Sequence, residues 1–304
     1  MPPIASRLDI APAQPYQDRE ALELVLSDLA EPARGQQIAR LVAQSERSAD
    51  TFEGLMVATR GSRVVAAGWA RLESGRTAMI YPPYAKVGDS DACEKILAAM
   101  LDFCGRRGAR TAQSLISLDH GPAADCLRAG GLAHLTDLVY LVSLGGTFPD
   151  APPAGPLEFV TYDPAIEDRY GKILERTYED THDCPELNGV RSTADTLDGY
   201  RATGRFDPRL WLLATLEGHD VGCLLMTEHE ERVVELIYMG LARDVRGRGL
   251  GLDLVRQGQW RARTLGAERM VVAVDARNER ALAVYGAAGF VGWDRRSVFF
   301  RALS

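Results

Sequence analysis

The chain has 304 residues, enough for two ordinary domains, and its 46% hydrophobic and 25% charged residues are typical of a globular protein. The formal net charge of −7 argues against a nucleic-acid partner, because proteins that bind polyanions are more often basic. No apolar run approaches about 20 residues, and the N-terminus lacks the apolar region of a signal peptide. We therefore expect a cytoplasmic protein with no membrane partner.

Five cysteines are scattered along the chain, and no two of them form a C-x-x-C pair. An odd number of widely spaced cysteines predicts neither a disulfide framework nor a zinc knuckle, so we expect reduced thiols. The neighbouring His182 and Cys184 are too few ligands for a zinc site, and no metal is predicted. The five cysteines are Cys93, Cys104, Cys126, Cys184 and Cys223.

The first half of the chain alternates strand-like and helix-like segments. Two strands flank a Gly-Ser turn at residues 61–62, which predicts a hairpin. The second helical pattern ends in glycines, which commonly stop helices. In chain order, the expected elements are strands 54–60 and 63–72, helix 92–109, strand 112–118, helix 122–132 and a closing strand at 137–144.

A segment rich in Gly and Pro separates the two halves near the middle of the chain. Seven of the thirteen residues at 144–156 are Gly or Pro, which is the composition of a linker. We therefore expect a first domain at 1–146, a linker at 147–156 and a second domain at 157–304.

The second half begins with three strands that short polar turns separate. A loop rich in Gly and Arg follows, and then a helix that Gly266 ends. Asn278 stands at the expected N-cap of another helix, and Gly289 stands at its end. In chain order, the expected elements are strands 209–216, 221–227 and 232–241, helix 249–265, strand 269–275, helix 278–289 and a closing strand at 295–303.

The two halves resemble each other in the order of their elements. Gly68 and Gly222 occupy similar places and are 154 residues apart, while Gly131 and Gly289 are 158 residues apart. Self-similarity at a nearly constant spacing predicts a tandem duplication. Two unrelated domains that share a common order of elements are the alternative.

Residues 243–251 read RDVRGRGLG and stand between a strand and a helix. Backbone N–H groups can close on phosphate oxygens where no side chain intervenes, so this loop predicts a phosphate-binding site. A dinucleotide-binding fold is one alternative, since Asp275 ends the next strand. However, a series of hairpins precedes the loop and only about 50 residues follow it, too few for a doubly wound sheet. A solvated surface turn is the other alternative.

The pattern Arg246-x-x-Gly249-x-Gly251 resembles the R/Q-x-x-G-x-G/A motif of the GNAT (GCN5-related) family of acyl-CoA-dependent N-acyltransferases. The resemblance covers most of residues 157–304 and extends only faintly to the first half. It implies an α/β (α+β) fold of two tandem GNAT-like domains, each with a mixed, mostly antiparallel sheet flanked by helices. The residues that follow the loop at the family's spacing are Asn278, Ala281, Tyr285 and Gly289–Phe290.

The resemblance implies acetyl-CoA (coenzyme A) as co-substrate. The amides of residues 246–251 and the positive end of the next helix dipole would bind its pyrophosphate. Its pantetheine arm would lie along residues 239–243, where the family's sheet splits and where Gly240 would suit a bulge. Asn278 would hold this arm or cap its helix. The implied cofactor-binding residues are Met239, Leu241, Arg243, Arg246, Gly247, Arg248, Gly249, Leu250, Gly251 and Asn278.

The resemblance also implies an N-acetyltransferase, in which a primary amine attacks acetyl-CoA directly. Tyr285, which shares a helix face with Asn278, would protonate the departing thiolate. Glu235 would be the base, by its place in a tandem member of the family, and strand alternation puts Val233, Glu235 and Ile237 on one face. The alternatives are a core tyrosine, a solvent-facing glutamate and a non-catalytic acyl-CoA-binding or regulatory module.

The family's acceptor site corresponds here to residues 176–192. The acidic side chains of this segment would draw a cationic amine, although a solvated loop is the alternative for most of them. The acceptor would be an amine of a small molecule or a peptide, and the chain would be a monomer or a homodimer. The candidate acceptor contacts are Asp180, His182, Asp183 and Asn188.

The first half lacks the parts that the resemblance assigns to catalysis. Residues 82–95 stand at the place of the phosphate loop and contain no R-x-x-G-x-G, and Asp89 and Asp91 would repel a pyrophosphate. Leu127 falls near the place of Tyr285. We therefore expect the first half to be catalytically silent.

Overall fold

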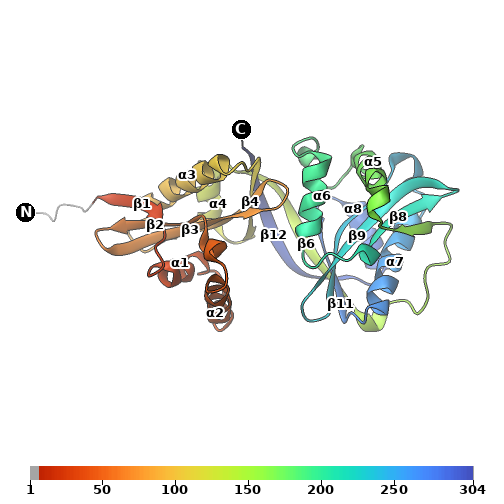
Figure 1. Cartoon of the computed structure of the whole chain (residues 1–304), viewed down its shortest axis with the longest axis horizontal. Coiled ribbons are helices and arrows are strands. Elements are labelled where there is room, and N and C mark those ends of the chain that lie inside the picture. The colour runs from red at the N-terminus through yellow and green to blue at the C-terminus, as the bar shows by residue number, and fades with distance from the viewer. Residues whose placement is uncertain (1–6, 304) are drawn as a thin grey trace, which may run out of the picture. The chain divides into compact units, whose positions relative to one another are not determined.

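The computed structural model describes residues 7–303 (Figure 1). Two compact units divide the chain: unit 1 comprises Met1–Leu135 and Ser297–Ser304, and unit 2 comprises Thr136–Arg296. Residues 1–6 and Ser304 lie outside the described residues. The prediction that the N-terminus lacks a signal peptide falls partly on these residues.

Unit 1 begins with a short strand and two helices, and a sheet and two further helices follow. A 3-10 turn at Ala49–Phe52 leads into the sheet. The elements are β1 (Leu8–Pro12), α1 (Asp18–Val25), α2 (Ala33–Ser45), β2 (Leu55–Arg60), β3 (Arg63–Glu73), β4 (Thr77–Ala85), α3 (Asp91–Arg106), β5 (Thr111–Ser117) and α4 (Gly121–Ala129).

β6 (Ala133–Leu144) follows α4 and ends the first repeat. The rest of the chain repeats the same order. The elements are β7 (Glu158–Thr161), α5 (Glu167–Tyr178), α6 (Thr193–Ala202), β8 (Trp211–Leu216), β9 (His219–His229), β10 (Val233–Leu241), α7 (Leu250–Thr264), β11 (Arg269–Asp275), α8 (Glu279–Ala287) and β12 (Val291–Ala302).

Alternation along the strands of unit 1 builds two hydrophobic layers, one on each face of its sheet. Met56 and Ala58 of β2 join a buried cluster with α3 and α4, whereas Leu55 and Val57 join a cluster with α1 and α2. Successive side chains of a strand point to opposite faces, so β2 is buried on both sides. The sheet order is β1-β2-β3-β4-β5, with β4 parallel to β5 and the other pairs antiparallel.

Unit 2 has the same architecture, with the sheet order β7-β8-β9-β10-β11 and β10 parallel to β11. Helices α5 and α6 lie on one side of this sheet, and α7 and α8 lie on the other (Figure 1). Gly258 of α7 lets that helix approach the sheet, because a Cβ there would be 3.0 Å from Met270 and 3.2 Å from Met226.

The strand that ends each repeat continues into the other unit. β6 follows α4 along the chain, yet it pairs antiparallel with β11 from Leu144 to Leu138. β12 follows α8 and neighbours β5, with its residues from Ser297 onward in unit 1. The expectation that 137–144 closes the sheet of the first half is therefore wrong. The contacts of residues 136–144 place them in unit 2. The domains predicted from the sequence, 1–146 and 157–304, place the same residues in the first domain.

Matching backbone details at the ends of α4 and α8 support a duplication. Gly131 and Gly289 follow these helices with φ angles of 79° and 82°. The next residue in each repeat donates its N–H to a helix carbonyl, Leu132 to Leu127 and Phe290 to Tyr285. Leu127 therefore occupies the backbone position that Tyr285 occupies in the second repeat.

β4 lies where the sequence predicts no strand, because it contains Pro82 and Pro83. A proline has no N–H for a sheet ladder. The pairing of β4 with β3 passes from Tyr81 to Tyr84 and skips both prolines, and its pairing with β5 covers only Thr77–Met79. The predicted loop at 82–95 therefore starts inside a strand.

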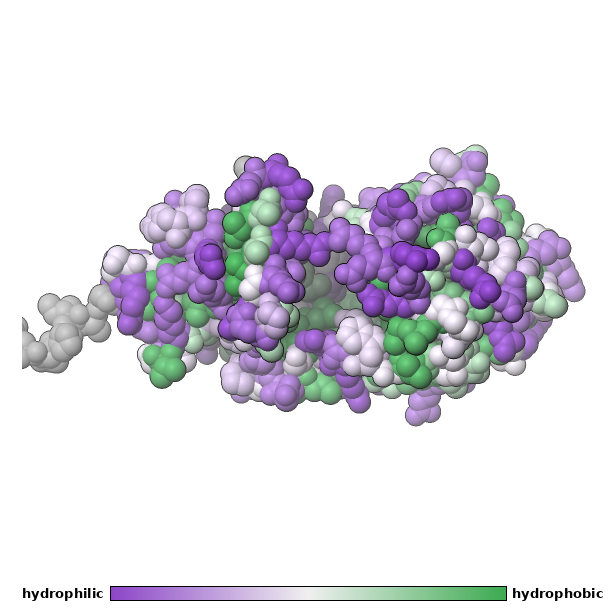
Figure 2. All heavy atoms as spheres, turned by 90° about the horizontal axis from the view of Figure 1, so that it is seen from below, coloured by the Kyte–Doolittle hydropathy of each residue, from purple (hydrophilic) through white to green (hydrophobic). Residues whose placement is uncertain are grey.

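The surface drawn in Figure 2 is mainly hydrophilic, and its hydrophobic residues form small, separated patches. Among residues 7–303, no helix is both long enough and apolar enough to cross a membrane.

Replacing Phe299 by alanine tests whether the last strand, β12, packs in unit 1 from Ser297 onward. The Phe299 side chain is 1% exposed, and its ring contacts His134 and the guanidinium of Arg128. Removing a buried phenylalanine costs about 3–5 kcal/mol, so we expect faster amide exchange in β5 and α4. Trp293→Ala is the control, since that side chain of the same strand is 60% exposed. A rise in amide hydrogen exchange only within residues 136–296 would contradict the assignment of residues from Ser297 onward to unit 1.

Candidate active site

The strands β10 and β11 pair over four residues and then separate. Their parallel register runs from Val233 opposite Arg269 to Leu236 opposite Val272. β10 continues to Leu241 and β11 to Asp275, and no further pairing joins them within residues 7–303. Backbone groups on the facing edges beyond Leu236 are therefore available to other partners.

A bulge at Ile237 redirects the side chains of β10 at this point. Leu236 is opposite Met226 and Tyr238 is opposite Leu225, so Ile237 is the extra residue. The bulge puts Glu235 and Tyr238 on one face of the sheet. Simple alternation past Glu235 would have put Tyr238 on the opposite face.

Gly240 is not the bulge residue, so that expectation is also wrong. A Cβ at Gly240 would lie 2.7 Å from Cβ of Thr177 and 2.8 Å from the Tyr238 hydroxyl oxygen. The glycine is needed because α5 approaches β10 closely at this residue.

The loop before α7 has the backbone of an anion cradle. Gly247 and Gly249 have φ angles of 78° and 80°, which L side chains rarely adopt. α7 begins at Leu250, so the positive end of its dipole adjoins the loop. Among the described residues, no carbonyl or side chain accepts from the amides of 247–251. Unpaired N–H groups at a helix N-terminus are suited to bind phosphate.

Arg246 supports this loop through its side chain. Its guanidinium donates to three backbone oxygens, at 2.9 Å to Leu241, 2.9 Å to Asp180 and 2.8 Å to Thr177. The loop is thereby tied to the ends of β10 and α5. Each of the three guanidinium nitrogens thus donates to the backbone, and Arg246 shapes the loop.

The other two arginines of the loop also have protein partners. Arg243 pairs with the Asp180 carboxylate at 3.0 Å, and Arg248 donates to the Asp244 carbonyl at 2.9 Å. Both side chains lie at the surface, where such contacts exchange readily with ligand contacts.

Three further predicted cofactor residues lie around the split. Met239 and Leu241 are half-buried on the part of β10 that pairs with β9 but not with β11. Asn278 caps α8, since its side-chain oxygen accepts the N–H of Ala281 at 3.1 Å.

Tyr285 is buried on α8, with 4% of its surface exposed and its ring 5.4 Å from that of Phe290. Burial raises the pKa of its phenol, and the negative charge of Asp183 raises this pKa further. The hydroxyl therefore keeps its proton at neutral pH, as a proton donor must.

Asp275 organises the end of β11 opposite the loop that follows α5. Its fully buried carboxylate accepts from Thr136 at 2.6 Å, from the Cys184 amide at 3.2 Å and from the Arg277 side chain at 2.8 Å. Burial raises the pKa of Asp275, but the hydrogen bonds from Arg277, Thr136 and Cys184 outweigh burial and lower it. Arg277 also binds Glu186 at 2.7 Å.

Only one of the four candidate acceptor residues lies beside Tyr285. Asp183 keeps solvent access, but surrounding atoms desolvate its carboxylate enough to raise its pKa, while the N–H of Asp275 donates to it at 3.4 Å. Asp180 pairs with Arg243, and Asn188 donates to the Tyr178 carbonyl at 3.1 Å. His182 is exposed.

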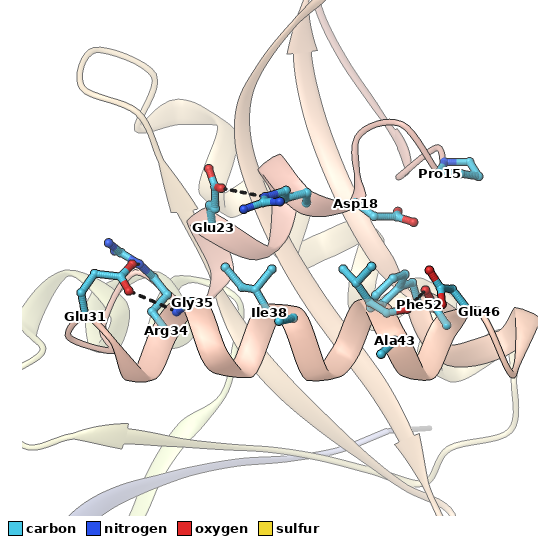
Figure 3. A pocket seen from close by; sticks show the side chains of 14 residues that line it. Pro15, Asp18, Glu23, Glu31, Arg34, Gly35, Ile38, Ala43, Glu46 and Phe52 are labelled. Carbon is cyan, nitrogen blue, oxygen red and sulfur yellow. Dashed lines mark hydrogen bonds and ion pairs between the residues drawn. The ribbon is translucent and has the colours of Figure 1, made fainter.

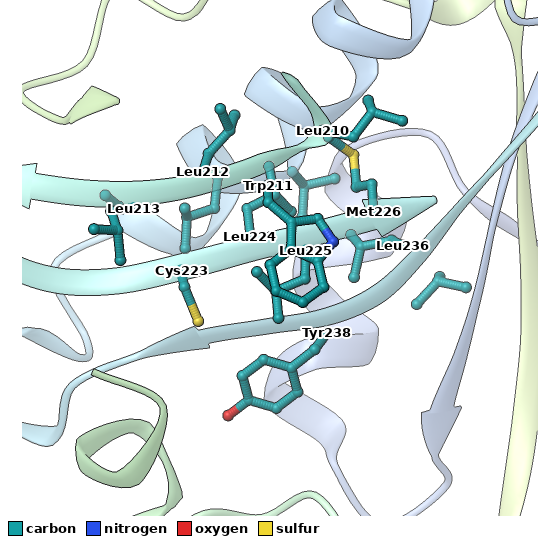
Figure 4. Packing of buried hydrophobic residues seen from close by; sticks show 14 of the residues in the cluster. Leu210, Trp211, Leu212, Leu213, Cys223, Leu224, Leu225, Met226, Leu236 and Tyr238 are labelled. Carbon is teal, nitrogen blue, oxygen red and sulfur yellow. The ribbon is translucent and has the colours of Figure 1, made fainter. Parts of the chain in front are cut away.

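A group of tyrosines lines the face of Glu235 under α5 and α6. The hydroxyl oxygens of Tyr238 and Thr177 are 2.7 Å apart, and those of Tyr178 and Tyr200 are 3.0 Å apart. Burial raises the pKa of Tyr178 to about 12. Figure 4 shows Tyr238 at the edge of the hydrophobic cluster around Trp211, with its hydroxyl pointing away from the aliphatic side chains.

Glu235 is half-buried on the same face, and its carboxylate lies 2.6 Å from Nε2 of His229. Sequence reasoning missed His229, although the short turn between β9 and β10 makes the two residues neighbours across the hairpin. It also missed Tyr140, which comes from β6. Burial raises the pKa of Tyr140, Glu235 raises it further, and Arg296 opposes this rise.

A separate pocket of about 840 Å³ lies in unit 1 between α1 and α2 (Figure 3). Its charged side chains include two ion pairs, Arg34 with Glu31 at 2.9 Å and Arg19 with Glu23 at 3.5 Å. No predicted site residue lines this pocket. Within residues 7–303, no group of three or more His, Cys, Asp or Glu side chains is arranged to hold a metal ion.

A model of the acetyltransferase (GNAT) family matches residues 174–290. The match includes the split strands, the glycine loop and the helix of Tyr285. The match covers 117 of the 304 residues of the chain. The predicted resemblance of this half is thus confirmed.

Relatives of this GNAT domain include mycothiol acetyltransferases. That of Corynebacterium efficiens is 37% identical over 134 residues, 42% of this chain and 43% of that protein. That of Streptomyces coelicolor is 36% identical over 100 residues, 33% and 32% of the two chains. That of Paenarthrobacter aurescens is 27% identical over 224 residues, 71% and 66% of the two chains. The chain therefore spans less than half the length of the first two relatives.

Solved structures of similar fold extend over nearly the whole chain. A GCN5-related N-acetyltransferase from Sphaerobacter thermophilus has a TM-score of 0.65 at 17% identity and covers 97% of this chain and 95% of its own. A tandem GNAT protein from the clavulanic acid biosynthesis pathway has a TM-score of 0.54 at 18% identity and covers 97% and 98%. The fold is two tandem GNAT-like domains, each with a mixed sheet flanked by helices.

Replacing Asp275 by asparagine tests the role of its buried carboxylate. The native pKa is lowered, so the charged form contributes stability above the ordinary aspartate pKa of about 3.9 and loses it as the pH falls further. We expect Asp275→Asn to lower the free energy of unfolding at pH 7 by roughly 1–3 kcal/mol, measured by urea denaturation.

The difference from the parent protein should shrink below about pH 4. Asp150→Asn is the matched control, because that aspartate is 89% exposed and pairs with Arg263 at the surface. Equal stabilities at pH 7, or a difference that persists unchanged at pH 3, would show that the carboxylate has no such role.

Proposed function

We propose that the protein is an N-acetyltransferase that moves an acetyl group from acetyl-CoA to a primary amine. The observation that supports it most is the row of unpaired amides at 247–251, at the N-terminus of α7 and beside the unpaired edge of β10. A pyrophosphate on the amides would leave the pantetheine arm free to follow β10 toward Tyr285.

In the proposed reaction, the amine nitrogen attacks the acetyl carbonyl carbon, a C–N bond forms, and the C–S bond to coenzyme A breaks. Glu235 takes the proton that the amine loses, and Tyr285 gives a proton to the departing sulfur. Free amines are mostly protonated at neutral pH, so a base is needed to prepare the nucleophile. Asp183, beside Tyr285, is the proposed contact for a cationic acceptor.

The proposed acceptor is a small-molecule amine, and the named relatives make a mycothiol-related amine the first to test. Peptide amines belong in the same panel. The decisive measurement is the release of free coenzyme A from acetyl-CoA in the presence of each amine. Tight binding of acetyl-CoA without release for any amine would favour a non-catalytic acyl-CoA-binding module instead.

Replacing Tyr285 by phenylalanine tests the proposed acid. The change removes one hydroxyl from a buried ring, and a positioned acid contributes about 10²–10⁴ to a rate. We expect kcat to fall by about 10²-fold or more, with little change in the Kd of acetyl-CoA. Tyr200→Phe is the control, since that phenol belongs to the separate tyrosine group. Full turnover by Tyr285→Phe would remove Tyr285 from the mechanism.

A pair of glycine variants tests which copy binds the coenzyme. Gly249 and Gly88 both precede a helix with positive φ, 80° and 91°, and a Cβ at either would meet nothing within 4 Å. Alanine at either residue costs roughly 1–2 kcal/mol of backbone strain. We expect Gly249→Ala to weaken acetyl-CoA binding at least about tenfold in calorimetry and Gly88→Ala to leave it unchanged. Equal weakening in both variants would place the coenzyme in both copies.

A further inference from the structure

The short contact between His229 and Glu235 joins the ends of two neighbouring strands. His229 is the last residue of β9 and is opposite Val233, while Glu235 is opposite Thr227. Their side chains therefore share one face, on a cross-strand diagonal. Nε2 of the imidazole lies 2.6 Å from Oε2 of the carboxylate, and the two side chains are 37% and 31% exposed.

His229 is the hydrogen-bond partner of Glu235 in the part of the chain that the structure describes. Tyr140 of β6 faces the same carboxylate, and its ring lies 5.8 Å from that of Trp293. On β11, Arg269 shares this face, and its guanidinium pairs with Glu231 at 3.1 Å.

The remaining charged groups near this face also have partners. Arg296 of β12 binds Asp294 at 2.8 Å, and both act on Tyr140. Arg205, whose carbonyl accepts from Thr227, pairs with Glu228. None of these groups makes a hydrogen bond to the Glu235 side chain among residues 7–303.

We propose that His229 is a positioning residue that holds the Glu235 carboxylate in the orientation in which it acts as a base. The neutral imidazole donates its Nε2 proton to Oε2, which fixes the carboxylate and leaves Oε1 free for the proton of the acceptor amine. This inference rests on the proposed N-acetyltransferase function, with Glu235 as base.

Two substitutions test the positioning effect. His229→Gln keeps an N–H donor, whereas His229→Ala removes the donor. We expect His229→Gln to retain kcat within about threefold. We expect His229→Ala to lower kcat about tenfold, a part of the ~10²–10⁴ that a general base supplies. Neither change should alter the KM for acetyl-CoA.

His219→Gln is the matched control, because that histidine begins the same strand β9 and is exposed at its other end. Its kcat should match that of the parent protein. His229→Asn provides a second uncharged donor if the glutamine variant does not fold, as judged by its melting temperature.

The parent protein is measured first, by release of coenzyme A with the acceptor panel. Absence of turnover there refutes the proposed function itself. If the parent protein is active and the glutamine and asparagine variants lose as much kcat as His229→Ala, the role of the His229 donor is refuted while the function stands. A kcat of His229→Ala equal to that of the parent would likewise refute positioning.

Discussion

The separation of β10 from β11 after Leu236 and Val272 is the constraint on which the candidate site depends. Two parallel strands that stayed paired would satisfy each other's backbone groups and leave nothing for a ligand. The bulge at Ile237 begins where pairing ends, and it turns Tyr238 toward α5. On the other edge, the Asp275 amide is satisfied by Asp183, so the loop after α5 reaches into the opening.

The same separation occurs in the first repeat, where β4 and β5 pair only over Thr77–Met79. The surroundings differ, however. Tyr84 and His120 both bind the Asp28 carboxylate, at 2.5 Å each, and His120 precedes α4 as Asn278 precedes α8. The duplicated backbone is thus retained while its polar side chains bind one another. This arrangement agrees with the proposal that catalysis belongs to the second repeat.

The sequence predicts the parts of the site that are local in the chain. Positive φ at Gly247 and Gly249, and the cap at Asn278, follow from glycine and asparagine chemistry within a few residues. It does not predict contacts that depend on the register beyond Leu236, such as Tyr238 with Thr177, because a single bulge resets which residues face each other. The exchange of β6 and β12 is equally hidden, since either sheet would accept a strand of suitable alternation.

The arginines of the glycine loop show how charge and backbone share the proposed phosphate site. Carbonyl groups at the C-terminal end of α5 carry partial negative charge, which would oppose a pyrophosphate nearby. Arg246 binds the Thr177 and Asp180 carbonyls there and compensates that charge. In the proposed site its role would be electrostatic and structural at once, and main-chain amides would contact the phosphate. Amides held in place by such a side chain need no reorganisation when the anion arrives, which favours binding.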